Sequence, residues 1–113
     1  MVKVLEINRY RAMWLLCLFD LPVKTKRQVK KATLFRKFLL EDGFQMMQYS
    51  VYLRPCPSED IAQLHEKRIK RNLPEKGEVR IIKITDAQYG RMFIFSNNSI
   101  KVVKNKENQL NFF

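Results

Sequence analysis

The sequence predicts an α+β fold in which four strands and two helices follow one another in the order βαββαβ. Three observations predict it. A continuous apolar run ends at Asp20, helical periodicity follows over about residues 25–41 and again from about residue 58, and runs rich in aromatic and β-branched residues lie at 44–54 and 79–84. Strands and helices that alternate at these lengths are typical of a sheet with helices packed on it.

The first strand extends from about Ala12 to Asp20. The seven consecutive apolar residues Met13–Phe19 predict a strand that is buried on both faces. A carboxylate seldom lies beside a core unpaired, because burying the charge costs several kcal/mol or shifts the pKa. Asp20 is therefore either a turn residue, which is ordinary before Leu21-Pro22, or a functional carboxylate.

The first helix begins after Thr25, which forms a capping box with Gln28, and ends near Glu41, with Gly43 as the left-handed residue that terminates it. One face is predicted to be buried. Its apolar residues, spaced by three and four, are Val29, Ala32, Phe35, Phe38 and Leu39.

The other face of this helix is basic, and no acid occurs before Glu41. Its cations, together with one in the preceding loop, are Lys24, Lys26, Arg27, Lys30, Lys31, Arg36 and Lys37. Like charges three and four residues apart destabilise a helix. A merely solvated face would usually interleave acids, so we favour a helix that faces phosphate groups.

The next region, 44–54, is a strand region whose length fits either one bent strand or two short strands with a bend at 48–50, and Pro55 and Pro57 are expected to close it. A second helix starts after the cap Ser58 and has a basic end. Its inward residues are predicted to be Ile61, Leu64 and Ile69, with His65 at the surface.

A third strand over 79–84 leads into a helical turn capped by Thr85 or Asp86, and a short strand follows at 92–95. The whole order is that of a ferredoxin-like sandwich with an added C-terminal strand. The uncovered sheet face predicts a homodimer packed through the sheets. We divide the chain into a domain over 1–96 and a tail over 97–113.

The tail ends in apolar residues that we expect to dock on the same domain, on a sister chain or on another protein. These residues are Leu110, Phe112 and Phe113.

The charge indicates a polyanionic partner. The formal net charge is +11 over 113 residues, which favours nucleic acid over an anionic membrane, since no lipidation motif or membrane-binding helix is present. We find no signal peptide and no membrane-spanning run. Cys17 and Cys56 show no metal-binding spacing, which predicts free thiols in a reducing cytoplasm.

Few catalytic chemistries fit. A single histidine counts against a Ser-His-Asp triad and a His-rich metal site, and no glycine-rich nucleotide motif occurs. Metal-assisted phosphodiester cleavage remains open, because magnesium binds carboxylate oxygens, phosphates and water. One Asp20 is a weak ligand set, whereas a two-fold axis near the strand end would supply a second.

Several motifs of this sequence resemble those of the small CRISPR-associated endoribonuclease family. This family is the second of the two universal CRISPR adaptation proteins, and it is the partner of the spacer integrase. The resemblance covers about residues 12–95. It is carried by Phe19-Asp20-Leu21-Pro22, Phe35-Arg36-Lys37-Phe38-Leu39-Leu40, Gly43-Phe44 and Gln48-Tyr49-Ser50-Val51-Tyr52. The version found in type II systems is suggested by Thr85, Gln88, Arg91 and Met92.

The resemblance implies a ferredoxin-like, cytoplasmic homodimer in which Asp20 is the catalytic, magnesium-binding aspartate. It implies a protein of spacer acquisition that binds the backbone of duplex DNA, or single-stranded RNA, and bridges integrase dimers, with the tail as an integrase-docking strand. The nucleic-acid-binding residues are then expected to be Arg27, Lys30, Lys31, Arg36, Lys37 and Ser50.

Three hypotheses result: a backbone-binding adaptor, a metal-dependent endonuclease, and a toxin-type ribonuclease of the virulence-associated D kind, which resembles the same family.

Overall fold

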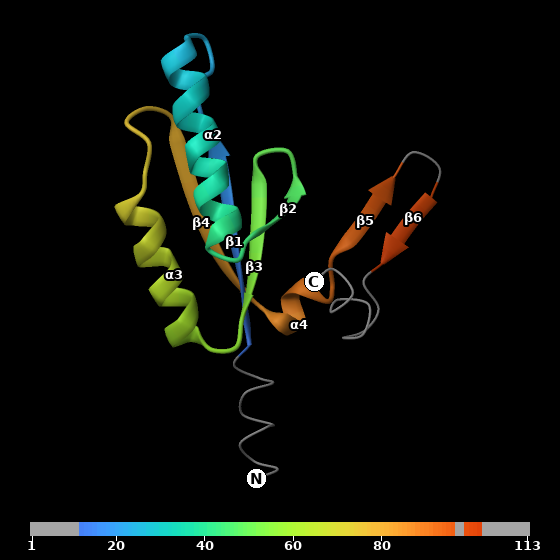
Figure 1. Ribbon diagram of the computed structural model, residues 1–113. Helices are drawn as coiled ribbons and strands as arrows, with labels where there is room; N and C mark the ends of the chain where they lie inside the picture. Colours follow the sequence, from blue (N-terminus) through green and yellow to red (C-terminus); the bar gives the residue numbers. More distant parts are fainter. Residues whose placement is uncertain (1–11, 97–98, 103–113) are drawn as a thin grey trace.

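The fold contains a four-stranded antiparallel sheet, two long helices and a separate hairpin (Figure 1). The computed structural model describes residues 12–96 and 99–102. In chain order the elements are β1 (Met13–Asp20), α2 (Lys26–Glu41), β2 (Gln45–Gln48), β3 (Val51–Cys56), α3 (Glu59–Arg71), β4 (Glu78–Thr85), α4 (Asp86–Tyr89), β5 (Phe93–Ser96) and β6 (Ser99–Val102).

The sheet has the strand order β2-β3-β1-β4, with β1 antiparallel to both of its neighbours. α2 and α3 lie together on one face (Figure 1). This arrangement confirms the predicted ferredoxin-like sandwich. β5 pairs only with β6 among the described strands, and this hairpin projects away from the main sheet.

Region 44–54 forms two strands rather than one. β2 and β3 are joined by a tight turn at Tyr49 and Ser50, where Ser50 has φ of 64°, a left-handed conformation that is uncommon outside glycine. Pro55 does not close β3, contrary to our expectation, and the strand continues to Cys56. A proline fits there because β2 no longer pairs with β3 beyond Leu53.

The predicted helix boundaries are confirmed. Thr25 forms a capping box with Gln28 at the start of α2, and Thr85 forms a second one with Gln88 at the start of α4. The Ser58 side chain accepts from a backbone amide of α3. Gly43, with φ of 91°, directly follows the C-cap of α2. Each device acts between residues close in sequence, which is why the sequence alone indicates it.

The main core lies between the sheet and the two helices. Its buried residues include Leu15, Cys17, Phe19, Phe35, Leu39, Phe44, Tyr52 and Ile69. Val29, predicted to be buried, is 47% exposed. The buried stripe of α2 is formed by Ala32, Phe35 and Leu39, so Val29 lies at its margin.

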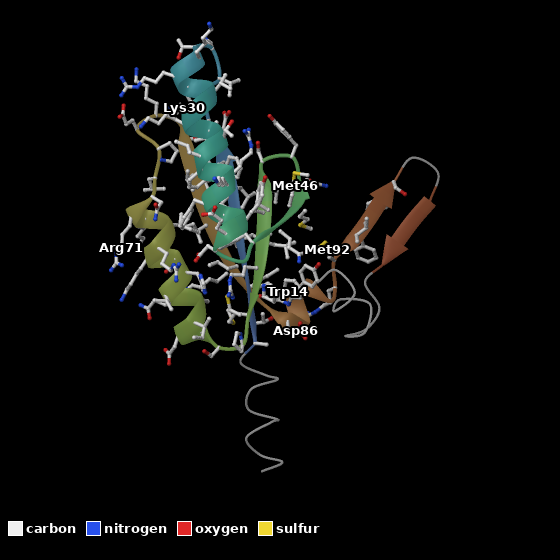
Figure 2. The ribbon with its side chains drawn as sticks, in the orientation of Figure 1. Trp14, Lys30, Met46, Arg71, Asp86 and Met92 are labelled. Carbon is white, nitrogen blue, oxygen red and sulfur yellow. The ribbon has the colours of Figure 1, made fainter. Side chains whose placement is uncertain are left out.

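A second cluster lies on the sheet face opposite α2 and α3. Trp14 stacks on Tyr89 of α4, with ring centroids 3.7 Å apart, and its indole nitrogen donates to Asp86 at 2.9 Å. Leu53 is buried with them, and Met92 packs against the group. Figure 2 shows Trp14 beside Asp86 and Met92, on the side of the sheet away from Lys30 and Arg71. The chain thus covers part of this face with α4 and Met92.

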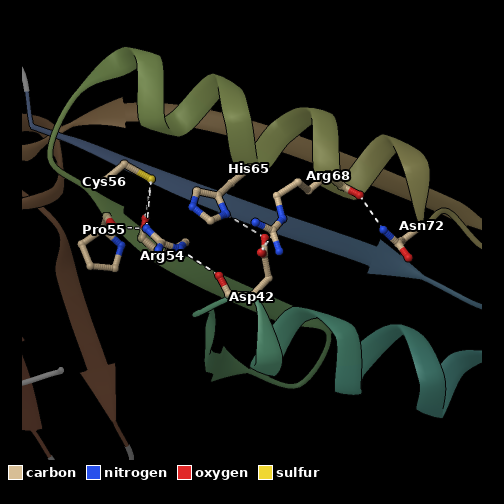
Figure 3. A network of polar contacts seen from close by, with 7 residues as sticks. All are labelled: Asp42, Arg54, Pro55, Cys56, His65, Arg68 and Asn72. Atoms are coloured by element: carbon tan, nitrogen blue, oxygen red, sulfur yellow. Dashed lines mark hydrogen bonds and ion pairs between the residues drawn. The ribbon is translucent and has the colours of Figure 1, made fainter.

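A buried carboxylate, Asp42, joins the end of α2 to α3 (Figure 3). One of its oxygens lies 2.7 Å from Nδ1 of His65, and the other lies 2.8 Å from Nε of Arg68. Because an ionised carboxylate only accepts, His65 Nδ1 carries the hydrogen. The backbone carbonyl of Asp42 accepts from Arg54 of β3 at 2.9 Å.

Two predictions for α3 are therefore wrong. His65 is 7% exposed rather than at the surface, and Leu64 is 48% exposed rather than inward. The buried stripe of α3 consists of Ala62, His65 and Ile69, at intervals of three and four. The stripe shifts by one residue because Asp42 gives the imidazole a buried hydrogen-bond partner.

Both cysteines are buried free thiols. Burial raises the pKa of Cys17 to about 12. Burial also raises the pKa of Cys56, although the neighbouring Arg54 opposes that shift. Within the described ranges no helix has the length and apolar character needed to cross a bilayer. Residues 1–11 of the predicted domain lie outside those ranges.

We predict that Asp42→Ala lowers the free energy of unfolding by about 2 kcal/mol, measured by urea denaturation. The change leaves a buried imidazole without its acceptor, whereas Arg68 is half exposed and can be solvated. The matched control is Glu75→Ala, which removes an exposed ion pair with Arg27 and should cost less than about 0.5 kcal/mol. Equal losses in the two variants would contradict the structural importance of Asp42.

Candidate nucleic-acid and metal site

Asp20 is exposed at the C-terminal end of β1. Its cross-strand partner on β4 is Glu78, so two carboxylates stand opposite each other at the edge of the sheet. Side chains alternate along a strand, which places Asp20 on the same face as Trp14 and Leu16, away from α2 and α3. Like charges directly opposite each other are unfavourable unless a cation lies nearby, and here Arg80 Nη2 lies 3.6 Å from a carboxylate oxygen of Glu78.

Gly77 fixes the backbone beside Asp20. A Cβ atom at Gly77 would lie 2.6 Å from the backbone oxygen of Asp20 and 2.9 Å from Leu21 Cδ2. Gly77 also has φ of 98°, which other residues rarely adopt. The 72–77 loop can therefore pack directly on the end of β1, because Gly77 has no side chain that would occupy the space of the Asp20 backbone.

The β2–β3 turn meets β1 at the same end. The amide of Phe19 donates to the carbonyl of Ser50 at 3.0 Å. Arg36 of α2 donates through Nη2 to the hydroxyl of Tyr49 at 3.2 Å, and its guanidinium lies over the rings of Tyr49 and Phe19, 5.3 and 5.9 Å from their centroids. Sequence reasoning missed Tyr49, which is the most exposed of the large hydrophobic side chains described.

The basic residues of α2 point in different directions. Lys30 and Lys37 are exposed and, being seven residues apart, share one face of the helix. Arg27 pairs instead with Glu75 of the loop after α3, at 3.3 Å. α3 has two acids in its first turn and three bases in its last turn, as the helix dipole favours. The first turn of α2 contains no acid and begins Lys26-Arg27.

A cleft of about 220 Å³ opens between the start of α2 and the 74–76 loop. Its residues are Leu21, Pro22, Thr25, Arg27, Gln28, Lys31, Ala32, Pro74, Glu75 and Lys76. Three of them are cations and one is an acid. The cleft borders the backbone after Asp20 and is positively charged, so it suits an anionic group better than an apolar one.

The predicted site residues therefore form three groups. Asp20, Arg36 and Ser50 lie near one end of the sheet, Arg27 and Lys31 line the cleft, and Lys30 and Lys37 lie along the exposed face of α2. Asp20 points to the sheet face opposite α2, so one chain does not bring its carboxylate together with Lys30 and Lys37. The predicted docking residues Leu110, Phe112 and Phe113 fall outside the described residues.

The carboxylates at Asp20 are of the kind that binds magnesium, but one chain supplies only part of the ligand shell. Asp20 and Glu78 are exposed carboxylates on one face, and magnesium is often bound by one or two carboxylates with waters and phosphate oxygens completing its shell. Among the described residues no group of three or more His, Cys, Asp or Glu side chains comes together. Further ligands must come from a second chain, a substrate or water.

We predict that Gly77→Ala displaces the Asp20–Leu21 backbone and lowers the free energy of unfolding by more than about 1 kcal/mol, measured by urea denaturation. The added Cβ meets a backbone oxygen, and its φ is strained for alanine. The control is Gly90→Ala, because Gly90 has a helical φ of −66° that alanine adopts readily. A wild-type unfolding midpoint in Gly77→Ala would contradict this packing.

Comparison with known proteins shows the family of this chain. The family model described as CRISPR associated protein Cas2 matches residues 13–92. Proteins named CRISPR-associated endoribonuclease Cas2 from several bacteria are similar to this chain. The relative in Flavobacterium psychrophilum is 48% identical over 90 residues, which are 80% of this chain and 78% of the relative.

The relative in Parvibaculum lavamentivorans is 45% identical over 101 residues, 89% of this chain and 100% of the relative. That in Paracidovorax avenae is 42% identical over 107 residues, 95% of this chain and 99% of the relative. The family match contains β1 with Asp20, the basic helix α2, the β2–β3 turn and α4. The chain therefore belongs to the Cas2 family of CRISPR-associated proteins.

Proposed function

We propose that this protein is a basic homodimer that binds the nucleic-acid backbone in CRISPR adaptation and carries a magnesium-dependent endonuclease site at its dimer axis. The observation that carries the proposal is the position of Asp20, an exposed carboxylate at a strand end on the sheet face that α2 and α3 leave open. A net charge of +11 supports a polyanionic partner.

Exposed apolar surface on the open face of the sheet supports the homodimer. α4 covers the open sheet face around Trp14, but Ile82 of β4, on the same face, remains 46% exposed. A second copy packed on this face would bury Ile82 and bring two Asp20 carboxylates near a two-fold axis. The predicted pair of metal-binding residues requires that arrangement, since one chain contributes too few ligands.

Magnesium, when bound, would activate water and neutralise charge on a phosphodiester. Asp20 would hold it in each chain, with Glu78 as a second carboxylate beside it. The names of the relatives, which describe endoribonucleases, favour phosphodiester hydrolysis as the reaction. The chain itself supplies binding and orientation: Gly77 and the Phe19–Ser50 hydrogen bond hold the backbone around Asp20.

Backbone binding is supported by the charge of α2. Cations at its N-terminus and along its exposed face are unfavourable for an isolated helix and become favourable beside phosphates. In the adaptor role the dimer bridges spacer-integrase dimers, with the C-terminal residues as the docking segment. The CRISPR-associated names of the relatives favour this role over the toxin-type ribonuclease.

We predict that Asp20→Asn abolishes magnesium-dependent cleavage of RNA or DNA, because the amide removes one charge per chain at the metal. Duplex binding and the sedimentation mass, expected at twice the 13.6 kDa of one chain, should remain unchanged. Cleavage is measured on labelled oligonucleotides with magnesium or with a chelator. Undiminished cleavage by Asp20→Asn would contradict the site, and a single-chain mass for the wild-type protein would contradict the dimer.

We also predict that duplex affinity falls steeply with salt and that the Lys30→Ala, Lys37→Ala double variant has a shallower dependence. Each lost phosphate contact should reduce the slope of log K against log salt by about 0.9. Fluorescence anisotropy between low and moderate salt measures it. Lys70→Ala on α3 is the control for loss of an exposed lysine, and an equal change there would show that α2 is not the binding face.

A further inference from the structure

The β2–β3 turn presents a single aromatic ring to solvent. Tyr49 is 77% exposed, whereas the other aromatic side chains near it, Phe19, Phe35 and Tyr52, are buried in the core. A turn requires no aromatic residue, and an exposed ring contributes nothing to the packing of the sheet. The ring is therefore available for a contact outside the chain.

The ring is held rather than free to rotate. Arg36 donates to the Tyr49 hydroxyl at 3.2 Å and places its guanidinium 5.3 Å from the ring centroid. The same guanidinium lies over Phe19, which anchors it to the core. Arg36 therefore covers one face of the ring through a cation–π contact and leaves the opposite face open.

The backbone of the turn is also fixed. Ser50 adopts a left-handed conformation, and its carbonyl accepts from the amide of Phe19. Tyr49 is one Cα step of about 3.8 Å from Ser50, and Asp20 is one such step from Phe19. Ser50 and Phe19 are separated by a cross-strand spacing of about 5.5 Å, so the Cα atoms of Tyr49 and Asp20 lie within about 13 Å of each other. Tyr49 is thus near the proposed metal site. Its side chain contacts Arg36 of α2.

We propose that Tyr49 is a stacking platform for one nucleobase of a single-stranded nucleic acid whose phosphates contact the exposed face of α2. The inference rests on the proposed backbone-binding function and deepens it by naming a residue that would contact a base. Within a duplex both faces of an internal base are covered by its neighbours, whereas an unpaired base can turn a free face to an aromatic ring. Aromatic platforms beside cationic grooves bind single strands in this way, largely independently of sequence.

Arg36 determines how the platform works. Its guanidinium polarises and orients the ring, while Lys37, the next residue, is exposed on the face that would contact phosphate. A base on the open face of Tyr49 would complete a stack of guanidinium, ring and base. Leucine at position 49 would keep apolar area but remove the planar face, and phenylalanine would keep the face but lose the Arg36 hydrogen bond.

The test compares two single strands of equal charge, an oligoadenylate and the same backbone without bases. Fluorescence anisotropy of the full chain is measured in a chelator, which prevents cleavage. The wild-type protein should bind the oligoadenylate about tenfold more tightly than the abasic strand. Tyr49→Leu should remove this preference and leave abasic and duplex binding unchanged. Tyr49→Phe should keep most of the preference.

The control is Phe95→Leu, the same loss of a ring at a residue of similar exposure, 70%, on β5. It should leave the preference unchanged. An unchanged preference in Tyr49→Leu, or an equal loss in Tyr49→Leu and Phe95→Leu, would overturn the stacking platform while the proposed backbone binding stands. Failure of the wild-type protein to bind any single strand or duplex at low salt would overturn both.

Discussion

The structure depends on one buried carboxylate. Asp42 ends α2 and accepts from His65 and Arg68 of α3 through its side chain and from Arg54 of β3 through its carbonyl. One residue thereby fixes both helices against each other and against a central strand. An unpaired charge at this depth would be strongly unfavourable, so the helix layer has one relative placement in which all three partners reach the same residue.

The position of α2 set by Asp42 also determines which residues reach the other end of the sheet, where Asp20 lies. With α2 fixed, Phe35 and Leu39 are buried against the strands, and Arg36 lies at the edge of the layer, where it contacts the β2–β3 turn. The Asp20 end is held independently by Gly77 and by the hydrogen bond from Phe19 to Ser50. The candidate site is thus assembled from residues of four segments, held by contacts distant from it in sequence.

This division explains what the sequence could predict. The sequence predicted the capping box of Thr25, a cap at Thr85 or Asp86, and the position of Asp20, because each depends on neighbouring residues or on the length of an apolar run. The structure assigns the second cap to Thr85. The Asp42–His65 pair spans 23 residues, and periodicity alone favoured a stripe through Leu64. Gly77 was missed because only the folded chain brings it to Asp20, although its position at the end of a loop was a signal.

The roles of the site residues remain predictions, as does the resemblance to the type II version. Tyr49 lay inside the motif that suggested the family, but its exposure and its contact with Arg36 follow from the turn geometry and not from the motif. α4 also covers more of the open sheet face than the element order indicated, because Tyr89 stacks on Trp14.

The two buried thiols have a practical consequence. The chain contains only Cys17 and Cys56, both inside the core, and burial suppresses the thiolate form that reacts with maleimides. A cysteine introduced on the surface would therefore be the one reactive thiol of the folded protein without prior removal of the native pair. Spin labels or fluorophores attached at such a position would report distances within and between chains in solution.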